Sequence, residues 1–187
     1  MDREFIIKEA RKIFRRRGYK KTNISDIAEK SNISVGSFYK YFKSKEEVFI
    51  EVYKLENDEF IDSVLNGINW RASLKDILTD YIEVFFNNKY SGNNILSERF
   101  NPDLVDIISN AMKNHTGPDF TNINEILRKR LSSIIGQTGH SNIQTEEYID
   151  ILDFLSYVKL TISEDKYPKK DERIGAILNL LISNMAK

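Results

Sequence analysis

The spacing of apolar residues along the chain predicts an all-helical protein. Between residues 3 and 17 apolar positions recur at intervals of three and four, with lysine and arginine on the opposite face, as in a helix with one buried side. Gly18 is expected to end that helix. Two shorter helices follow at about residues 24–30 and 35–41. Short helices joined by a tight turn are typical of a helix-turn-helix.

Polar residues at the expected helix ends support this interpretation. Asn23 and Ser34 stand where an N-cap is needed, and Asp26 occupies the third helical position after Asn23, from which a carboxylate can bond back to the cap. Asn32 lies between the two short helices and can adopt the left-handed conformation that glycine more often supplies. The turn therefore has the local chemistry that it needs.

Apolar stripes continue beyond residue 45 and bring the expected total to about nine helices. The further helices are expected at about residues 45–66, 71–88, 102–112, 120–134, 145–163 and 171–186. We expect two domains, a helix-turn-helix domain over residues 1–48 and a larger helical effector-binding and dimerisation domain over residues 49–187. The long helix at 45–66 would join them.

The distribution of charge along the chain indicates more about function than the net charge does. The formal net charge is zero, yet residues 1–45 hold 13 Lys and Arg against five Asp and Glu, and the rest of the chain holds 15 against 23. A basic N-terminal part on an acidic remainder suits a protein that directs one end toward phosphates. Chance clustering of charge on a solvated helix is the alternative.

The third helix carries the residues that suit contact with nucleic acid. Phe38 and Phe42 lie four residues apart and are expected to pack inward. Gly36 and Ser37 keep the first turn slim enough to approach base edges. Hydroxyl and ammonium groups for phosphates and bases follow in this order: Tyr39, Lys40, Tyr41, Lys43 and Lys45.

At these residues the sequence resembles the TetR family of repressors. The resemblance rests on two segments, Thr22–Ala28 and Ile33–Phe49, and on the run Tyr-x-Tyr-Phe-x-Ser-Lys-Glu within the second. It covers roughly residues 5–50. Asn23 replaces the usual Ser or Thr cap and Asn32 the usual turn glycine, and both substitutes can do the same physical work.

The resemblance implies a cytoplasmic homodimer whose two helix-turn-helix domains occupy successive major grooves of a pseudo-palindromic operator. It implies phosphate contacts by Thr22, Tyr39, Tyr41 and Lys45. It implies base contacts by Val35, Gly36, Ser37 and Lys40. It also implies a small-molecule effector, of unspecified identity, that releases the DNA.

Two sets of apolar residues beyond residue 66 are candidates for further sites, with the chain's own core as the alternative for each. The last two helices are apolar on several faces, which favours a dimer interface. Its candidate residues are Ile151, Leu155, Val158, Ile174, Leu178 and Leu181. Aromatic residues of the middle helices are candidates for an apolar effector pocket. They are Trp70, Tyr81, Phe85, Phe86, Phe100 and Phe120.

Other functional classes find little support in the sequence. The chain has no cysteine, no glycine-rich phosphate loop and no apolar run long enough for a membrane span. His115 and His140 are expected at the surface, without carboxylates at metal-ligand spacing. We therefore expect no enzymatic activity, no cofactor and no metal. The alternative to a DNA-binding repressor is an interaction protein of the same fold whose helix-turn-helix binds a protein partner.

Overall fold

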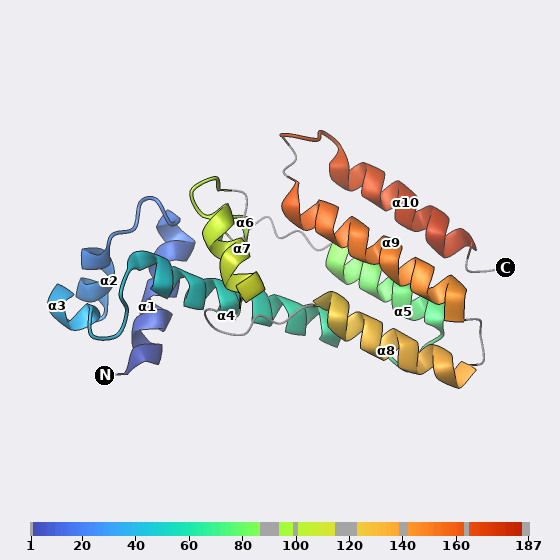
Figure 1. Ribbon diagram of the computed structural model, residues 1–187, viewed down its shortest axis with the longest axis horizontal. Helices are drawn as coiled ribbons and strands as arrows, with labels where there is room; N and C mark the ends of the chain where they lie inside the picture. Colours follow the sequence, from blue (N-terminus) through green and yellow to red (C-terminus); the bar gives the residue numbers. More distant parts are fainter. Residues whose placement is uncertain are drawn as a thin grey trace. The chain divides into compact units, whose positions relative to one another are not determined.

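A computed structural model describes residues 2–86, 94–98, 101–114, 123–138, 142–162 and 165–184. Their regular structure is helical throughout, as predicted (Figure 1). In chain order the elements are α1 (Arg3–Arg17), α2 (Ile24–Lys30), α3 (Val35–Phe38), α4 (Lys45–Asn66), α5 (Leu74–Tyr81), the π-helical segment η1 (Ile82–Phe86), α6 (Asn94–Ser97), α7 (Val105–Asn114), α8 (Ile123–Thr138), α9 (Asn142–Thr161) and α10 (Lys170–Asn184).

The helices form two compact units. The N-terminal unit contains α1, α2, α3, the part of α4 up to Phe60, and also α6 and α7. The C-terminal unit contains the rest of α4 from Ile61, followed by α5, η1, α8, α9 and α10. A functional boundary between residues 48 and 49 stays a prediction. The presence of α6 and α7 in the N-terminal unit was not part of the sequence prediction.

The core of the N-terminal unit joins the helix-turn-helix to α6 and α7. Phe14 of α1 and Phe49 of α4 are fully buried and meet edge to face, with ring centroids 5.1 Å apart. Ile95 of α6 and Ile108 of α7 are buried in the same cluster. Burial of large apolar side chains is worth about 1.5–3 kcal/mol each. The helix-turn-helix therefore shares its hydrophobic core with residues more than 50 positions beyond the end of α3 at Phe38.

The predicted cap and turn residues of the helix-turn-helix are confirmed. Gly18 has φ +74° and its N–H donates to Phe14 O at 2.8 Å, and Asn32 has φ +53°. The Ser34 hydroxyl accepts from the N–H of Ser37 at 3.0 Å. The Asp26 carboxylate accepts from the N–H of Asn23 at 2.9 Å, a bond that lowers the pKa of Asp26.

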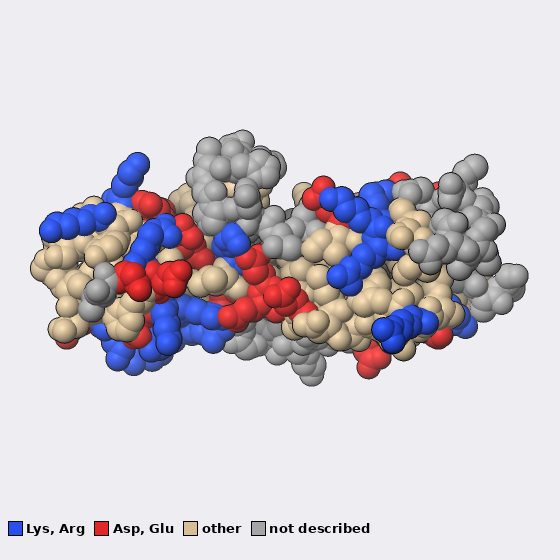
Figure 2. Space-filling model, turned by 90° about the horizontal axis from the view of Figure 1, so that it is seen from below, with Lys and Arg blue, Asp and Glu red and all other residues tan. Residues whose placement is uncertain are grey.

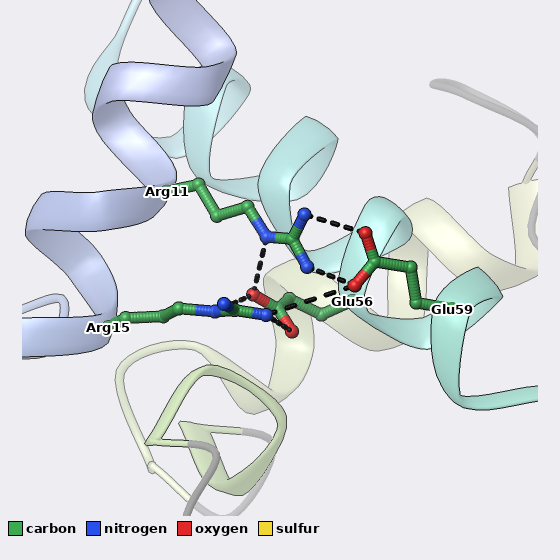
Figure 3. A network of polar contacts seen from close by, with 4 residues as sticks. All are labelled: Arg11, Arg15, Glu56 and Glu59. Carbon is green, nitrogen blue, oxygen red and sulfur yellow. Dashed lines mark hydrogen bonds and ion pairs between the residues drawn. The ribbon is translucent and has the colours of Figure 1, made fainter. Parts of the chain in front are cut away.

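A network of two arginines and two glutamates joins α1 to α4 (Figure 3). Glu56, only 2% exposed, accepts from Arg11 Nε at 2.8 Å and from Arg15 Nε at 2.6 Å. Glu59 accepts from Arg11 Nη1 at 2.7 Å. Arginine forks suit carboxylates because they can donate two parallel hydrogen bonds. This arginine–glutamate network sets the position of α1 along α4.

The C-terminal unit is built on α5, η1, α8, α9 and α10. Its buried aromatic side chains come from α5 and η1, where the predicted helix at 71–88 begins only at Leu74 and widens into a π-helix from Ile82. Gly67 follows α4, and a methyl group added there would lie 2.8 Å from the Val84 side chain.

In the described part of the chain, none of the helices combines the length and the apolar character that crossing a membrane demands.

Candidate nucleic-acid interface

Helix α3 divides its side chains into a buried and an exposed set. Phe38 is fully buried and Phe42 is 1% exposed, with their ring centroids 5.5 Å apart, so both pack inward as expected. Val35 is 42% exposed and Tyr39 is 53% exposed. Lys40 is exposed as well. The two phenylalanines thus anchor α3 and turn its remaining residues outward.

Six of the eight predicted DNA contacts lie together on and just after α3. They are Val35, Gly36, Ser37, Tyr39, Lys40 and Tyr41, of which Ser37 and Tyr41 are half-buried and the others exposed. We call this set the α3 surface. Val35 and Tyr39 each leave much of their side chain in solvent, while the Tyr39 ring meets the buried Phe38 ring edge to face with centroids 5.7 Å apart.

The fold itself does not require the glycine at position 36. A methyl group there would meet only Ser34 Oγ, at 3.9 Å, which is ordinary van der Waals contact. Glycine inside a helix costs about 0.5–1 kcal/mol relative to alanine. A residue that lowers stability without a steric reason inside the chain fits a surface that another molecule approaches closely.

The other two predicted contacts, Thr22 and Lys45, are engaged within the chain. Thr22 is fully buried and its hydroxyl donates to Gly18 O at 2.8 Å. Lys45 Nζ donates to Tyr19 O at 3.2 Å and to Thr22 O at 3.1 Å. Their roles at phosphates stay predictions. In the DNA-free chain both hold the turn between α1 and α2.

Tyr19 is a residue at the centre of this turn that the sequence analysis missed. The Lys45 ammonium lies 3.9 Å from the centre of the Tyr19 ring, and the Tyr19 hydroxyl donates to Glu46. Burial, together with this bond to a carboxylate, raises the pKa of Tyr19. The same hydrogen bond lowers the pKa of Glu46. A tyrosine directly after a helix-ending glycine was the available signal.

Cations near α3 remain available to a ligand. Lys and Arg side chains gather on a face of the N-terminal unit, beside Asp and Glu (Figure 2). Counting only partners among the described residues, six exposed cations before residue 45 form no ion pair: Lys8, Arg16, Lys21, Lys30, Lys40 and Lys43. Lys40 and Lys43 adjoin the α3 surface in sequence. Phosphates attract such unpaired cations most strongly, because no internal carboxylate competes.

The predicted effector residues are brought together only in part. Tyr81, Phe85 and Phe86 are buried side by side, with the Tyr81 and Phe85 ring centroids 5.2 Å apart. The Tyr81 hydroxyl shares a hydrogen bond of 2.9 Å with Ser156 Oγ. Trp70 takes no part in this cluster: its Nε1 donates to Leu65 O at 3.0 Å and its ring lies under Arg130. The remaining two candidates, Phe100 and Phe120, lie outside the described residues, as do His115 and His140.

The cavity beside this cluster is small. It measures about 10 Å³ and is lined by Leu78, Ile82, Tyr148, Leu152, Leu181 and Ile182. One water molecule fills a space of that size, whereas pockets for small molecules measure about 300–1,000 Å³. An effector would have to open this part of the C-terminal unit.

Three predicted dimer-interface residues require a correction. Leu155, Ile174 and Leu178 are between 0% and 4% exposed, so they pack in the core of the C-terminal unit and leave no surface for a partner. Val158 and Leu181 are half-buried, and Ile151 is 37% exposed. Among the described side chains of α9 and α10, the large exposed apolar ones are those of Ile151, Phe154, Tyr157, Ile177 and Leu180.

Comparison with known proteins agrees with this architecture. Residues 6–52 match the sequence profile of the bacterial regulatory proteins of the tetR family. The chain is 30% identical over 82 residues to a fatty acid metabolism regulator protein of Bacillus subtilis, a match that covers 44% of this chain and 42% of that protein. It is 36% identical over 90 residues, 46% of this chain and 31% of the relative, to an uncharacterised HTH-type transcriptional regulator, YuxN, of the same species. The chain thus spans less than half the length of these curated relatives.

Similarity in three dimensions extends over nearly the whole chain. The structure of the transcriptional regulator FadR from Bacillus subtilis, in complex with stearoyl-CoA, matches with a TM-score of 0.59 and 22% sequence identity. The match covers 97% of this chain and 98% of that one. It shows that the helices after α4 follow the same fold as those of a regulator. Residues 6–52 therefore carry the N-terminal domain of the bacterial regulatory proteins of the tetR family, and the chain shares the fold of a solved transcription regulator.

Proposed function

We propose that this regulator is a cytoplasmic repressor that binds a pseudo-palindromic operator as a homodimer and is released by a small apolar or aromatic effector. The observation that carries the proposal is the α3 surface, where exposed Val35, Tyr39 and Lys40 surround a glycine that the fold does not need. Valine suits the thymine methyl group and lysine suits guanine O6 and N7. The tyrosine hydroxyls suit phosphate oxygens, which fix the register of a reading helix.

Two helices of the C-terminal unit support the homodimer. α9 and α10 lie side by side (Figure 1), and both carry large apolar side chains that are exposed in the single chain: Ile151, Phe154, Tyr157, Ile177 and Leu180. Phe154, Tyr157 and Leu180 are each more than 60% exposed. Apolar surface of this kind on neighbouring helices is typical of a protein interface. A two-fold partner also matches the symmetry of a palindrome.

The aromatic cluster of α5 and η1 supports an apolar effector. Tyr81, Phe85 and Phe86 give that region apolar walls and one hydroxyl, the composition common in small-molecule pockets. A π-helix such as η1 occurs often at functional sites because its widened turn is less stable than an α-helix. The stearoyl-CoA held by the similar FadR of Bacillus subtilis is consistent with an apolar ligand in this fold.

Footprinting and salt titration together test the DNA-binding part of this proposal. The full chain should protect two half-sites in the intergenic DNA beside its own gene, and its affinity for that fragment should fall steeply as salt rises. Each phosphate contact contributes a slope of about −0.9 in a plot of log K against log salt. A chain that protects no DNA, or whose binding is insensitive to salt, would favour the alternative of a protein partner.

Lys40→Ala should relax sequence preference at one base position in each half-site. We expect a loss of about 1–3 kcal/mol for the preferred base, because a cation on a reading helix donates directly to the guanine edge. The measurement is binding to a set of operators that carry single base changes. Lys8→Ala removes another unpaired cation, on α1, and serves as the control with unchanged preference. A uniform loss of affinity in Lys40→Ala would make this residue a backbone contact.

A further inference from the structure

The turn between α1 and α2, residues 18–23, is held from two sides. On one side Lys45 of α4 donates to Tyr19 O and Thr22 O. On the other side Glu98, which directly follows α6, accepts a hydrogen bond of 2.8 Å from the N–H of Tyr19 through its Oε1. Tyr19 is therefore bound at its nitrogen, its carbonyl and its hydroxyl.

The surroundings of Glu98 are shaped to hold its carboxylate in this position. Its second oxygen accepts from Asn101 Nδ2 at 2.8 Å, so that both oxygens are fixed. The backbone of Gly18, at φ +74°, runs close by: a methyl group at that position would lie 3.1 Å from Glu98 Oε1. Gly18 thus ends α1 and also leaves room for the incoming carboxylate.

We infer that Glu98 is a positioning residue for DNA binding, supplied by a segment outside the helix-turn-helix sequence. It anchors Tyr19, which is 7% exposed and whose N–H has no helical partner after α1 ends. Lys45 donates to the carbonyls of both Tyr19 and Thr22, so the position of Tyr19 is connected to that of Thr22. Thr22 comes shortly before α2, which is followed by the α3 surface. The inference rests on the proposed function, since it assigns to Glu98 a share in presenting the α3 surface to DNA.

A neighbouring ion pair between the same two segments contributes much less to holding the turn between α1 and α2. Lys20 and Asp103 form an ion pair of 2.8 Å, but their side chains are 64% and 61% exposed. Exposed pairs of this kind contribute little because water and salt screen them. Glu98 differs because it accepts from the backbone N–H of a buried residue. Loss of the Glu98 carboxylate would leave that N–H donor without an acceptor, which costs more than the loss of a solvated ion pair.

The decisive experiment separates the reach of the Glu98 side chain from its charge. Glu98→Gln keeps the length and an acceptor oxygen but removes the charge, whereas Glu98→Asp keeps the charge but withdraws it by one methylene. We expect Glu98→Gln to bind the footprinted DNA fragment nearly like wild type, because its amide oxygen still accepts from the Tyr19 N–H while only the bond from Asn101 Nδ2 is given up. Glu98→Asp should bind it about tenfold more weakly, with an unchanged salt slope because no phosphate contact is lost. Asp103→Asn is the control and should bind like wild type.

Hydrogen exchange of the Tyr19 amide in the DNA-free chain gives a second readout. Exchange should be slow in wild type and Glu98→Gln and faster in Glu98→Asp, measured under conditions in which each variant is stable enough that exchange through global unfolding does not contribute. All affinities are measured well below the unfolding transition of each variant, so that a lower melting temperature alone leaves them unchanged.

Several results would overturn the inference while leaving the proposed function in place. They are wild-type binding by Glu98→Asp, equal weakening in both Glu98 variants, and slow Tyr19 exchange in all variants. Failure of the wild-type chain itself to bind the fragment would instead overturn the proposed function, and the inference with it.

Discussion

Replacing both arginines of the arginine–glutamate network by methionine should destabilise the protein by about 3–5 kcal/mol, the usual cost of leaving one partner of a buried ion pair behind. In Arg11→Met/Arg15→Met the Glu56 carboxylate loses the guanidinium groups of Arg11 and Arg15, while its position at 2% exposure denies it water. The measurement is urea unfolding of the full chain, followed by fluorescence of Trp70 and by circular dichroism.

Adding Glu56→Leu to that double variant should restore much of the lost stability. A leucine needs no partner at this position, and buried ion pairs replaced by apolar side chains are often as stable as the original. Lys20→Met, which removes an exposed pair, is the control and should unfold close to the wild-type urea concentration. A double methionine variant that unfolds at the wild-type urea concentration would show that the buried carboxylate needs no cation.

The arginine–glutamate network lies on the same helix, α4, as the lysine that holds the α1–α2 turn. This helix begins at Lys45, which holds the α1–α2 turn, and extends to Asn66 in the C-terminal unit. Glu56 and Glu59 lie in its N-terminal unit portion and fix α1 to it. We expect α1 to follow any displacement of α4, because two arginines of α1 donate to the buried carboxylate of Glu56 on α4.

Local chemistry made the helix-turn-helix predictable. Gly18, Ser34 and Asn32 each act within four residues of their own position, so the sequence pattern contains the whole cause of each helix end. The end of α3 was less predictable, because Tyr39 to Tyr41 carry no breaker. That helix ends at Phe38 where a pattern based on propensity continues it to about residue 41.

Contacts between distant segments were beyond prediction. The bond from Tyr19 to Glu98 spans 79 residues and that from Arg11 to Glu56 spans 45, and no periodicity indicates which charged residue meets which. The four-residue helix α6 is too short to show a period at all. For the same reason the assignment of α6 and α7 to the N-terminal unit came only from the structure.

The dimer-interface prediction illustrates a further physical limit. An apolar stripe on a helix indicates burial but does not reveal whether the same chain or a second copy covers it. The regular stripe through Leu155 and Leu178 proved to be the intramolecular core. The less regular residues Phe154, Tyr157 and Leu180 are the exposed ones, because an amphipathic helix points its best stripe at its own core first.

Phe154→Asp should convert the protein into a folded monomer that has lost most of its affinity for the operator. Phe154 is 64% exposed in the single chain, so the substitution removes little internal packing. In the proposed dimer it places a carboxylate in an apolar interface without a partner, which such an interface does not tolerate. Operator affinity should fall by about 100-fold or more, because two linked heads bind their half-sites with a high effective concentration that a monomer lacks.

Sedimentation velocity measures the loss of the dimer, and operator binding measures the loss of affinity. A control variant separates disruption of the interface from unfolding of the chain. Leu178→Asp places the same charge on α10 at a position that is fully buried in the single chain, so it should unfold the C-terminal unit rather than yield a folded monomer. Leu180→Asp, on the same helix but 65% exposed, should behave like Phe154→Asp. A Phe154→Asp protein that sediments as a dimer and binds the operator with wild-type affinity would place the two-fold contact elsewhere on the chain.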